Sequence, residues 1–570
     1  MSLRGTGVSP GIGMGAAYVL TGAVPEPAPG STYEGPPEPE RERAVAALGQ
    51  VAGELEARGN RAGGEAKEIL KAQALIAEDP GLVVGVKALI DEGIAAPRAV
   101  YQAFAKYRDM LASAGGYLGE RVADLDDIRD RVIARLTGHP LPAPPPDPGT
   151  GEPYVLIAID LAPADTALLS KDVVAAFVTE GGGPTSHTAI LSRAMGVPAV
   201  VACPGATEIP PGTRVLVDGN TGEVRLEPTE SDVARHVSAN DARRQRMTTG
   251  GPGRTRDGYL VQLLANIGGP GDLDGAVAAG AEGVGLYRTE FLFLGRPEAP
   301  SVAEQEQVYR AALAAFPGGK VVVRTLDAGA DKPLAFLPPA APEPNPALGE
   351  RGLRLFERFP EVMDSQLEAL SVAAAVDRAG AVRAGTAAAE LQVMAPMVAT
   401  AQEAKWFADA CHTRGLPQAG VMIEIPAAAL RAESLVTVVD FVSIGTNDLA
   451  QYTFAADRQS GALGSLQDPW QPALLDLVAM TATAAADNGK PCGVCGESAA
   501  DPAMACVLVG LGVTTLSMGA AALPAVRTGL GAHTLDECQL AAQAARGAST
   551  PAHARAAARS HLPGLVPLGV

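Results

Sequence analysis

A histidine follows a glycine-rich stretch in the run GGGPTSHT, residues 181–188. Glycines allow a tight turn and close approach of the backbone, and Thr185 or Ser186 can cap a helix that begins there. The free N–H groups and the positive dipole end of a helix start favour an anion. A phosphorylated His187 would therefore have its negative charge stabilised at this point. Because most single loop histidines have no catalytic role, the interpretation depends on the glycines and the helix start.

Polar side chains also follow apolar, strand-like runs in the C-terminal half of the chain. These residues are Arg288, Arg324, Glu424, Asn447, Asp448 and Cys495. The fork of an arginine binds two oxygens of a carboxylate or phosphate at once, and one or two carboxylates with substrate oxygens are typical of Mg²⁺ sites. A thiol with an ordinary pKa near 8.5 stays mostly protonated at neutral pH. The alternatives are surface salt bridges for the arginines, and pairing of the two carboxylates with nearby arginines.

Cys492 and Cys495 form a C-x-x-C pair, which raises the question of redox chemistry or half a zinc site. No second Cys/His pair lies at zinc spacing, and no thioredoxin-like βαβ pattern surrounds the pair. We therefore treat Cys492 as incidental.

The elements that must position these residues alternate between short strands and helices. Eight strand candidates occur after residue 253: LLANI, GVGLYR, VVVRTLD, LQVMAPM, GVMIEIP, FVSIGTND, CGVCGE and TLSM. Eight such units predict a (β/α)8 TIM-type barrel, typically about 250 residues, over 253–570. Barrels of this kind keep their chemistry at the carboxyl ends of the strands, where the six polar residues fall.

The N-terminal half divides into two kinds of sequence. Residues 24–140 start in a Pro-rich, acidic stretch, continue with helix-periodic segments and predict an all-helical domain. Residues 1–23 and 141–229 contain the strand candidates GAAYVL, YVLIAID and VVAAFVTE and predict a small α/β domain into which the helices are inserted. A linker helix is expected within 230–252. We consider this linker and the Pro-rich junctions at 24–44 and 140–153 as candidate hinges.

Composition sets the broad class of protein. The chain has 570 residues, 47% hydrophobic and 19% charged, with a net charge of −19. This charge disfavours nucleic acid and anionic membranes as partners and suits a basic protein, although plain solubility accounts for most of it. The sequence shows no signal peptide and no apolar run that would insert in a membrane. Six cysteines form no disulfide framework. These features predict a cytoplasmic protein.

Several motifs together resemble one family along essentially the whole chain. They are GGGPTSHTAILSRAMGVPAVV, the long run DFVSIGTNDLAQYTFAADR at 440–458, GVGLYRTEFLF, VVVRTLDAGADKP, NPALGERGLR, VMIEIPAAA, CGESAADP and the opening GVSPGIGMG. This set resembles Enzyme I of the bacterial sugar phosphotransferase system, the phosphoenolpyruvate–protein phosphotransferases. Ser186 before His187 favours this family over the related pyruvate phosphate dikinases and phosphoenolpyruvate synthases, which typically have Cys-His.

The resemblance implies an activity and a role for each motif residue. The enzyme would transfer the phosphoryl group of phosphoenolpyruvate to His187 and then to a histidine of the carrier protein HPr, releasing pyruvate, as the first general step of sugar uptake. The implied substrate-binding residues are Arg288, Arg324, Asn447, Asp448 and Arg458, with Arg351 as a further candidate. Glu424 and Asp448 would hold Mg²⁺, and Cys495 would donate a proton. HPr would dock on the inserted helices, and the barrel would form a homodimer.

The chain departs from the family pattern at Pro184, Gln73, Gln471 and Glu368, where basic residues are usual. None of these removes a residue assigned to chemistry, but Gln73 lies in the expected carrier-docking region. A phosphoenolpyruvate synthase or dikinase would need an ATP-binding domain, for which the sequence has no Gly-rich nucleotide loop. A regulatory phosphohistidine protein that senses phosphoenolpyruvate is the other alternative, and the complete Arg/Glu/Asp/Cys set favours turnover.

Overall fold

The chain forms two compact units, Met1–Asn240 and Asp241–Val570. The computed structural model describes residues 2–20, 24–62, 64–114, 116–139, 153–161, 169, 172–182, 187–235, 238, 250–329, 333–338, 343, 345–457 and 461–568. The boundary falls in the predicted linker helix: residues 230–235 are helical, and most of the remaining prediction lies outside the described residues. Among the described residues, no helix combines the length and apolar character that crossing a membrane requires.

The first unit contains a mixed sheet whose described strands run in the order β1-β8-β7-β3-β4-β5-β6-β2. Their bounds are β1 Ser2–Arg4, β2 Thr6–Ser9, β3 Ile12–Val19, β4 Tyr154–Ala158, β5 Val174–Thr179, β6 Ala199–Val201, β7 Arg214–Asp218 and β8 Glu223–Leu226. Helix α7, His187–Met195, follows β5. Apolar side chains pack in two separate clusters of the sheet region, one around Val155 and Val178 and the other around Leu156 and Phe177. This buried sheet positions the start of α7.

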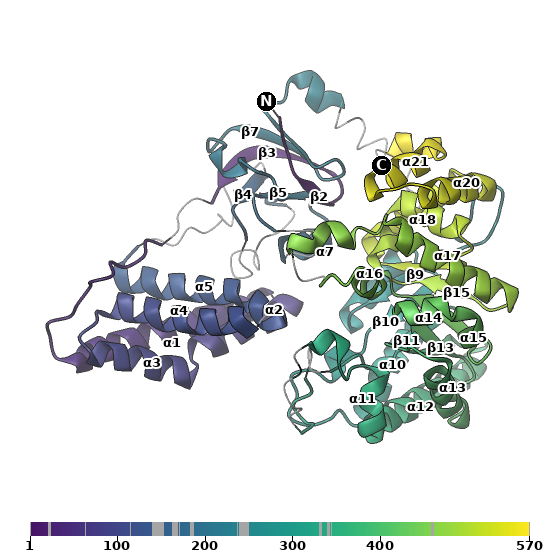
Figure 1. Cartoon of the computed structure of the whole chain (residues 1–570), viewed down its shortest axis with the longest axis horizontal. Coiled ribbons are helices and arrows are strands. Elements are labelled where there is room, and N and C mark those ends of the chain that lie inside the picture. Colours follow the sequence, from purple (N-terminus) through teal and green to yellow (C-terminus); the bar gives the residue numbers. More distant parts are fainter. Residues whose placement is uncertain are drawn as a thin grey trace. The chain divides into compact units, whose positions relative to one another are not determined.

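Among the described residues, five helices interrupt the sheet between its neighbouring strands β3 and β4, which pair in parallel (Figure 1). They are α1 Pro37–Ala62, α2 Gly64–Ala77, α3 Pro80–Asp91, α4 Ala96–Ala114 and α5 Gly116–Thr137. The helices enclose an apolar cluster of their own, which includes Leu48, Leu70, Val86, Phe104 and Ile128. A separate core is the physical mark of a part that is able to fold as a unit.

The Pro-rich stretch before α1 is bound to these helices. Arg98 Nη1 donates to Glu26 Oε1 at 2.6 Å and to the carbonyl of Pro27 at 3.0 Å. Further along, the N–H of Tyr33 donates to the carbonyl of Gly93 at 2.8 Å. Residues 26–33 are therefore part of the helical region, although their composition suggested a hinge.

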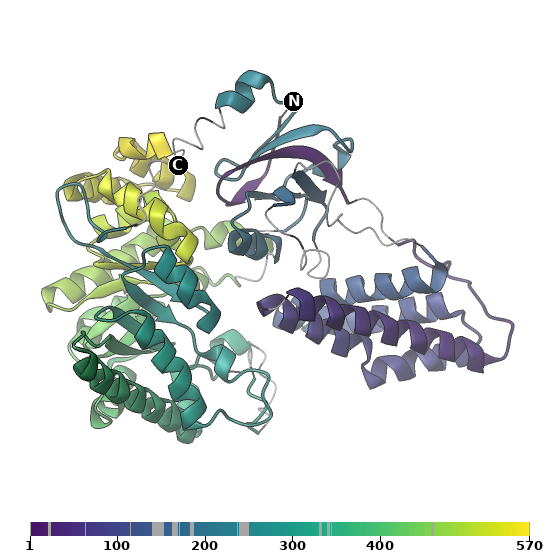
Figure 2. The same ribbon diagram turned by 180° about the vertical axis from the view of Figure 1, so that it is seen from behind.

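The second unit is a closed barrel of parallel strands, in agreement with the predicted TIM-type fold (Figures 1 and 2). The strands are β9 Gln262–Ile267, β10 Gly283–Tyr287, β11 Lys320–Arg324, β12 Glu390–Ala395, β13 Ala419–Ile423, β14 Phe441–Ile444, β15 Cys492–Val494 and β16 Thr515–Met518. All eight coincide with predicted strands, because parallel strands covered on both faces are short continuous apolar runs.

Helices surround the barrel and cover the outer faces of its strands. They are α9 Leu273–Ala278, α10 Val302–Ala315, α11 Leu353–Arg358, α12 Pro360–Ala384, α13 Ala401–Thr413, α14 Pro426–Leu430, α15 Ala432–Val436, α16 Thr446–Thr453, α17 Pro472–Asp487, α18 Pro502–Gly510, α19 Leu523–Gly531, α20 Leu535–Arg546 and α21 Pro551–Ser560. A large apolar core lies between strands and helices. A smaller cluster joins Leu286, Val322, Met394, Met422, Phe441 and Cys495.

Candidate active site

The carboxyl ends of the barrel strands carry the predicted site residues. Arg324 is the last residue of β11, Arg288 and Glu424 directly follow β10 and β13, and Cys495 directly follows β15. Asn447 and Asp448 lie in the first turn of α16, just beyond β14. Because all strands of the barrel are parallel, these ends meet on one face.

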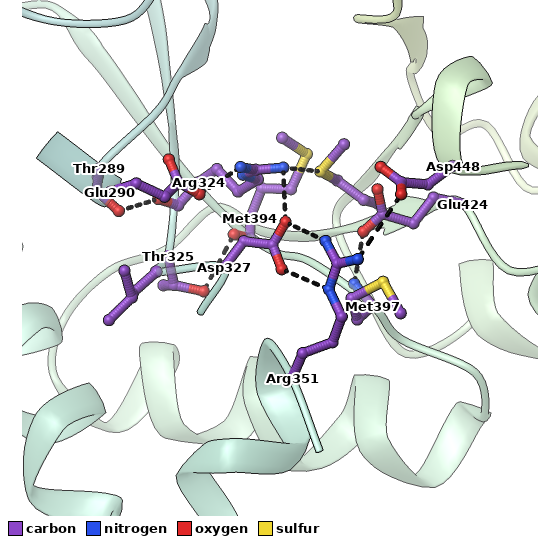
Figure 3. A network of polar contacts seen from close by, with 12 residues as sticks. Thr289, Glu290, Arg324, Thr325, Asp327, Arg351, Met394, Met397, Glu424 and Asp448 are labelled. Atoms are coloured by element: carbon purple, nitrogen blue, oxygen red, sulfur yellow. Dashed lines mark hydrogen bonds and ion pairs between the residues drawn. The ribbon is translucent and has the colours of Figure 1, made fainter. Parts of the chain in front are cut away.

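Arg324 is buried between two carboxylates (Figure 3). Its Nη2 donates to Glu290 Oε1, and its Nη1 lies 3.4 Å from Asp327 Oδ2. Burial alone would lower the pKa of the Arg324 guanidinium, but the charges of Glu290 and Asp327 outweigh it and raise that pKa. Arg324 is therefore a fixed, permanently charged group at the end of its strand.

Arg351 is held by the same Asp327 from a different part of the chain (Figure 3). Its Nε and Nη2 donate to the two carboxylate oxygens of Asp327 at 3.2 and 2.9 Å. The remaining nitrogen, Nη1, lies 3.4 Å from the hydroxyl of Tyr452 and 3.8 Å from Asp448 Oδ1. Arg351 thus connects the arginine cluster to the carboxylates of the neighbouring strands.

Glu424 is a buried carboxylate next to Asp448. Its Oε1 accepts a hydrogen bond of 2.6 Å from the N–H of Met397, whereas its buried Oε2 has no hydrogen-bond partner among the described residues. Burial raises the pKa of Glu424 to about 8, and the negative charges of Asp448 and Asp327 act in the same direction. A buried acceptor without a donor fits a cation ligand, because a positive ion would supply the missing partner.

A metal ion at this place would depend on few protein ligands. No three His, Cys, Asp or Glu side chains of the described residues gather into a metal-binding cluster. Glu424 and Asp448 provide two carboxylates, which matches the way Mg²⁺ is commonly held, with water and substrate oxygens completing its shell. The alternative pairing with arginines applies to Asp448, through its contact with Arg351. No ion pair joins Glu424 to an arginine within the described part of the chain.

Cys495 lies in the smaller apolar cluster, next to Met422 and Leu286. Burial raises the pKa of its thiol to about 11, so the group is a protonated thiol at neutral pH. Cys492 instead packs in the outer core between strands and helices. The two thiols of the C-x-x-C pair thus belong to different clusters, which removes the support for a redox or zinc function.

Arg288 and Asn447 line the site with fewer constraints. The Arg288 side chain is exposed and makes no ion pair with a described residue. Asn447 Oδ1 accepts a long hydrogen bond of 3.4 Å from the N–H of Glu497. Arg458, the third predicted substrate arginine, lies outside the described residues.

The structure places His187 at the first residue of α7, as the predicted helix start requires. Its side chain and Pro184 lie outside what the structure describes. The next residue, Thr188, is buried, and its Oγ1 donates to Asp160 Oδ1 at 3.4 Å. This contact joins the start of α7 to the segment that follows β4.

The other departures from the family pattern have different surroundings. Gln73 is fully buried in α2, and Glu368 is exposed on α12. Gln471 stands directly before α17, where its Nε2 donates to the carbonyl of Ser465 at 3.1 Å. None of the three contacts a predicted site residue through a described hydrogen bond.

Sequence reasoning did not assign Glu290 and Asp327, the two carboxylates that hold the arginines. Both stand in motifs used for the resemblance, Glu290 in GVGLYRTEFLF and Asp327 in VVVRTLDAGADKP. The available signal was their position, two residues beyond Arg288 and three beyond Arg324 respectively. A buried arginine requires a carboxylate partner, so both acids could have been sought as partners of Arg324.

Comparison with known proteins defines the class. The family model described as "PEP-utilising enzyme, PEP-binding domain" matches residues 242–534, the one described as "mobile domain" matches 150–222, and the one described as "N-terminal" matches 4–121. The barrel site and these matches are those of a phosphoenolpyruvate-utilising enzyme.

Relatives matched over most of their length define the family within that class. The chain is 57% identical over 566 residues to a phosphoenolpyruvate-protein phosphotransferase of Streptomyces coelicolor, covering 99% of both chains. It is 39% identical over 484 residues to that of Staphylococcus carnosus, covering 81% of both, and 37% identical over 548 residues to that of Haloferax volcanii, covering 92% of this chain and 93% of the relative. The chain belongs to the phosphoenolpyruvate–protein phosphotransferase family, Enzyme I.

Proposed function

We propose that this chain transfers the phosphoryl group of phosphoenolpyruvate to His187, and then to a histidine of an HPr-type carrier protein, releasing pyruvate. This is the first general step of sugar uptake by the phosphotransferase system. The observation that carries the proposal is the convergence, at one face of the barrel, of buried arginine, paired buried carboxylates and a buried thiol. Arg324, Glu424, Asp448 and Cys495 form this set.

Arginines supply the binding energy for an anionic substrate. Phosphoenolpyruvate has a carboxylate and a phosphate, and Arg288, Arg324 and Arg458 are proposed to bind these groups. Because Arg324 is buried and already oriented, little side-chain freedom is lost when it donates to the substrate. Arg351 is a further candidate, and Asn447 is proposed to orient the substrate from the start of α16.

Glu424 and Asp448 are proposed to hold Mg²⁺. The free, buried Oε2 of Glu424 supports this assignment. When bound, the ion offsets negative charge on the phosphoryl group and on the enolate oxygen. Asp448 also faces Arg351 at 3.8 Å, which limits the negative charge that gathers around the two carboxylates before substrate binds.

The chemical step exchanges one bond to phosphorus for another. An imidazole nitrogen of His187 attacks phosphorus, the bond from phosphorus to the enol oxygen breaks, and its electron pair stays on that oxygen. The enolate then takes a proton at its terminal carbon from the Cys495 thiol, giving pyruvate, and the thiolate regains a proton from water. The raised pKa of Cys495 keeps this proton on sulfur until the strongly basic carbon is formed.

The division of labour along the chain follows from these roles. Residues 1–23 and 141–229 are proposed as the phosphohistidine domain, 24–140 as the carrier-docking domain, 230–252 as the linker, and 253–570 as the substrate-binding and dimerisation domain. Reacting atoms must come within about 3–3.5 Å for transfer. The phosphohistidine domain must therefore approach the barrel to receive the phosphoryl group and the carrier to deliver it.

The proposal is tested with phosphoenolpyruvate labelled in its phosphoryl group, Mg²⁺ and the purified full chain, with and without an HPr-type protein. We expect label on the chain without the carrier, and transfer of that label when the carrier is added. Label that stays on the chain with every carrier tested would favour a regulatory phosphohistidine protein.

A further inference from the structure

Asp327 occupies the centre of the arginine cluster without having a role in the chemistry described above. Its side chain is 2% exposed, and so is that of Arg351, to which it is bound through both oxygens. The same carboxylate lies 3.4 Å from Arg324 Nη1. One acid therefore bridges two guanidinium groups that come from segments 27 residues apart (351 − 324).

The backbone around Asp327 joins the same two segments. Gly329 and Arg351 form an isolated antiparallel bridge, and the N–H of Gly352 donates to the carbonyl of Ala328 at 2.9 Å. A Cβ on Gly329 would lie 2.4 Å from that of Arg351, so the close approach needs glycine there. Gly352 has φ +59°, which an L side chain rarely adopts. Both glycines suit a fixed contact between the segments.

The third nitrogen of Arg351, Nη1, gives this contact a consequence for the reaction, because it lies near both Tyr452 and Asp448. With Nε and Nη2 committed to Asp327, only Nη1 faces Asp448, and it stops 3.8 Å short of Oδ1. An Arg351 released from Asp327 would be a mobile, buried cation beside Asp448, which its Nη1 already approaches. Opposite charges attract strongly at low dielectric, so it would pair closely with Asp448 and compete with a metal ion there.

We propose that Asp327 is a positioning residue, which acts chiefly by fixing Arg351, and to a smaller extent Arg324, so that both face the substrate and Asp448 is left to the metal ion. This inference rests on the proposed function, since it assumes phosphoenolpyruvate and Mg²⁺ at this face. Asp327 itself touches neither; it acts through the arginines. Loss of its charge is therefore expected to weaken both substrate and metal interactions at once.

The test compares Asp327→Asn, Arg351→Met and the double variant in the full chain. The readouts are kcat and KM for phosphoenolpyruvate in label transfer, and the Mg²⁺ concentration at half-maximal rate. For Asp327→Asn we expect kcat/KM to fall about 100-fold, the cost of misplacing a group by roughly 1 Å, and the Mg²⁺ requirement to rise at least about tenfold. Asp440→Asn is the matched control. Asp440 stands directly before β14, at the end of the barrel strands opposite the site, and its carboxylate contacts His412.

The double variant separates positioning from an independent contribution. If Asp327 acts largely through Arg351, the double variant is at most about tenfold worse than Arg351→Met alone, because coupled residues are not additive. An additional 100-fold loss would overturn the proposal, as would an Asp327→Asn enzyme with wild-type kcat/KM and Mg²⁺ requirement. If Asp327→Asn does not fold, the double variant still tests the proposal, because it removes both buried charges. Its kcat/KM is then compared with that of Arg351→Met alone. A wild-type chain that takes up no label would instead contradict the proposed function itself.

Discussion

Glu424 is the residue whose surroundings most restrict what the site can contain. A carboxylate that is buried, has one unpartnered oxygen and lies near Asp448 and Asp327 is costly to ionise without a cation. A bound metal ion removes this cost, because a positive charge stabilises the ionised form. Metal binding at the proposed site would thus be linked to the protonation of one side chain.

Glu424 makes a prediction about stability and pH. Its folded-state pKa of about 8 lies above the ordinary value of 4.5, so the folded protein holds this proton more tightly than the unfolded chain. Without metal, the contribution of Glu424 to the free energy of unfolding therefore falls as pH rises from 4.5 through about 8. We expect Glu424→Gln to raise the unfolding temperature of the metal-free barrel at pH 9 by at least about 2 °C, with little effect at pH 5. Both tryptophans, Trp406 and Trp470, lie in the barrel and report its unfolding.

Mg²⁺ provides the control for that measurement. Added at pH 9, it should stabilise the wild-type barrel, which can use the ionised Glu424, and have a much smaller effect on Glu424→Gln. Equal stabilisation of both proteins by Mg²⁺ would remove Glu424 from the metal site.

Cys495 makes a prediction about the fate of the enolate. Cys495→Ala should slow pyruvate formation about 100-fold, the lower range of what a positioned general acid contributes, because no other described thiol lies in the small cluster around it. Pyruvate release is followed with a coupled assay in the presence of an HPr-type acceptor. Cys492→Ala, which alters a thiol of the outer core, is the control and should retain a rate within about twofold of wild type. A wild-type rate for Cys495→Ala would eliminate it as proton donor.

At the scale of elements, the barrel was predictable and the small sheet only partly so. Each of the eight barrel strands is a short buried run such as the one at 283–287, bounded by loops, and this pattern is recognisable without tertiary information. By contrast, β1 and β2 are three and four residues long, and most of their residues are not buried. Segments this short show no periodic hydrophobic pattern. They are strands because they pair with β8 and β6, which the sequence alone does not indicate.

The candidate site was predictable where it depends on strand ends and not where it depends on contacts between loops. Arg324 ends a strand, and Glu424 and Cys495 directly follow strands, so the parallel topology alone brings them to one face. The pair of hydrogen bonds between Asp327 and Arg351 depends instead on the path of the chain between the two residues. For the same reason the contacts of residues 26–33 were not specified, although the segment was assigned to the helical domain 24–140, since Pro-rich composition does not indicate which surface it contacts.

Gln366 of helix α12 makes hydrogen bonds to the segments that follow β10 and β11 and carry site residues. The Gln366 amide accepts from the N–H of Leu326 at 3.0 Å and donates to Thr289 Oγ1 and the hydroxyl of Tyr309 at 3.2 and 3.0 Å. Thr289 in turn donates to the carbonyl of Arg324 at 3.0 Å. This fully buried side chain ties the loops that follow β10 and β11 to one helix.

Gln366→Leu is therefore expected to lower the free energy of unfolding of the barrel by about 3 kcal/mol, since it leaves buried donors and acceptors unsatisfied. Urea unfolding followed by tryptophan fluorescence measures this change. Ser371→Ala on the same helix removes one partly buried hydrogen bond, to the carbonyl of Arg414, and should cost under about 1.5 kcal/mol. A loss for Gln366→Leu no larger than that control would contradict its supporting role.

At the scale of the whole molecule, the chain consists of parts with separate cores. The barrel core and the core of α1–α5 are distinct clusters, and the division of the chain into two compact units falls within the linker region. Parts that share no core are free to unfold separately. Such independence suits the proposed transfer, in which the phosphorylated histidine must reach both the barrel and a carrier.

Ligand binding should therefore stabilise one part of the chain only. The His187→Ala variant lacks the proposed phosphorylation site. In this variant, phosphoenolpyruvate and Mg²⁺ should increase the free energy of unfolding of the barrel by about 2.7 kcal/mol at 100 times the dissociation constant, and so raise its unfolding temperature. The other transitions seen by calorimetry should not move. A uniform shift of every transition would show that the parts unfold together and that the barrel does not bind independently.

The central claim concerns His187, which begins α7 and is proposed to receive the phosphoryl group. The most direct measurement incubates wild-type chain and His187→Ala with labelled phosphoenolpyruvate and Mg²⁺, and locates the label by peptide mapping under conditions that preserve phosphohistidine. We predict label on His187 in the wild type, none in His187→Ala, and retained phosphoenolpyruvate binding by the variant. Label on another residue, or label on histidine in the variant, would contradict the claim.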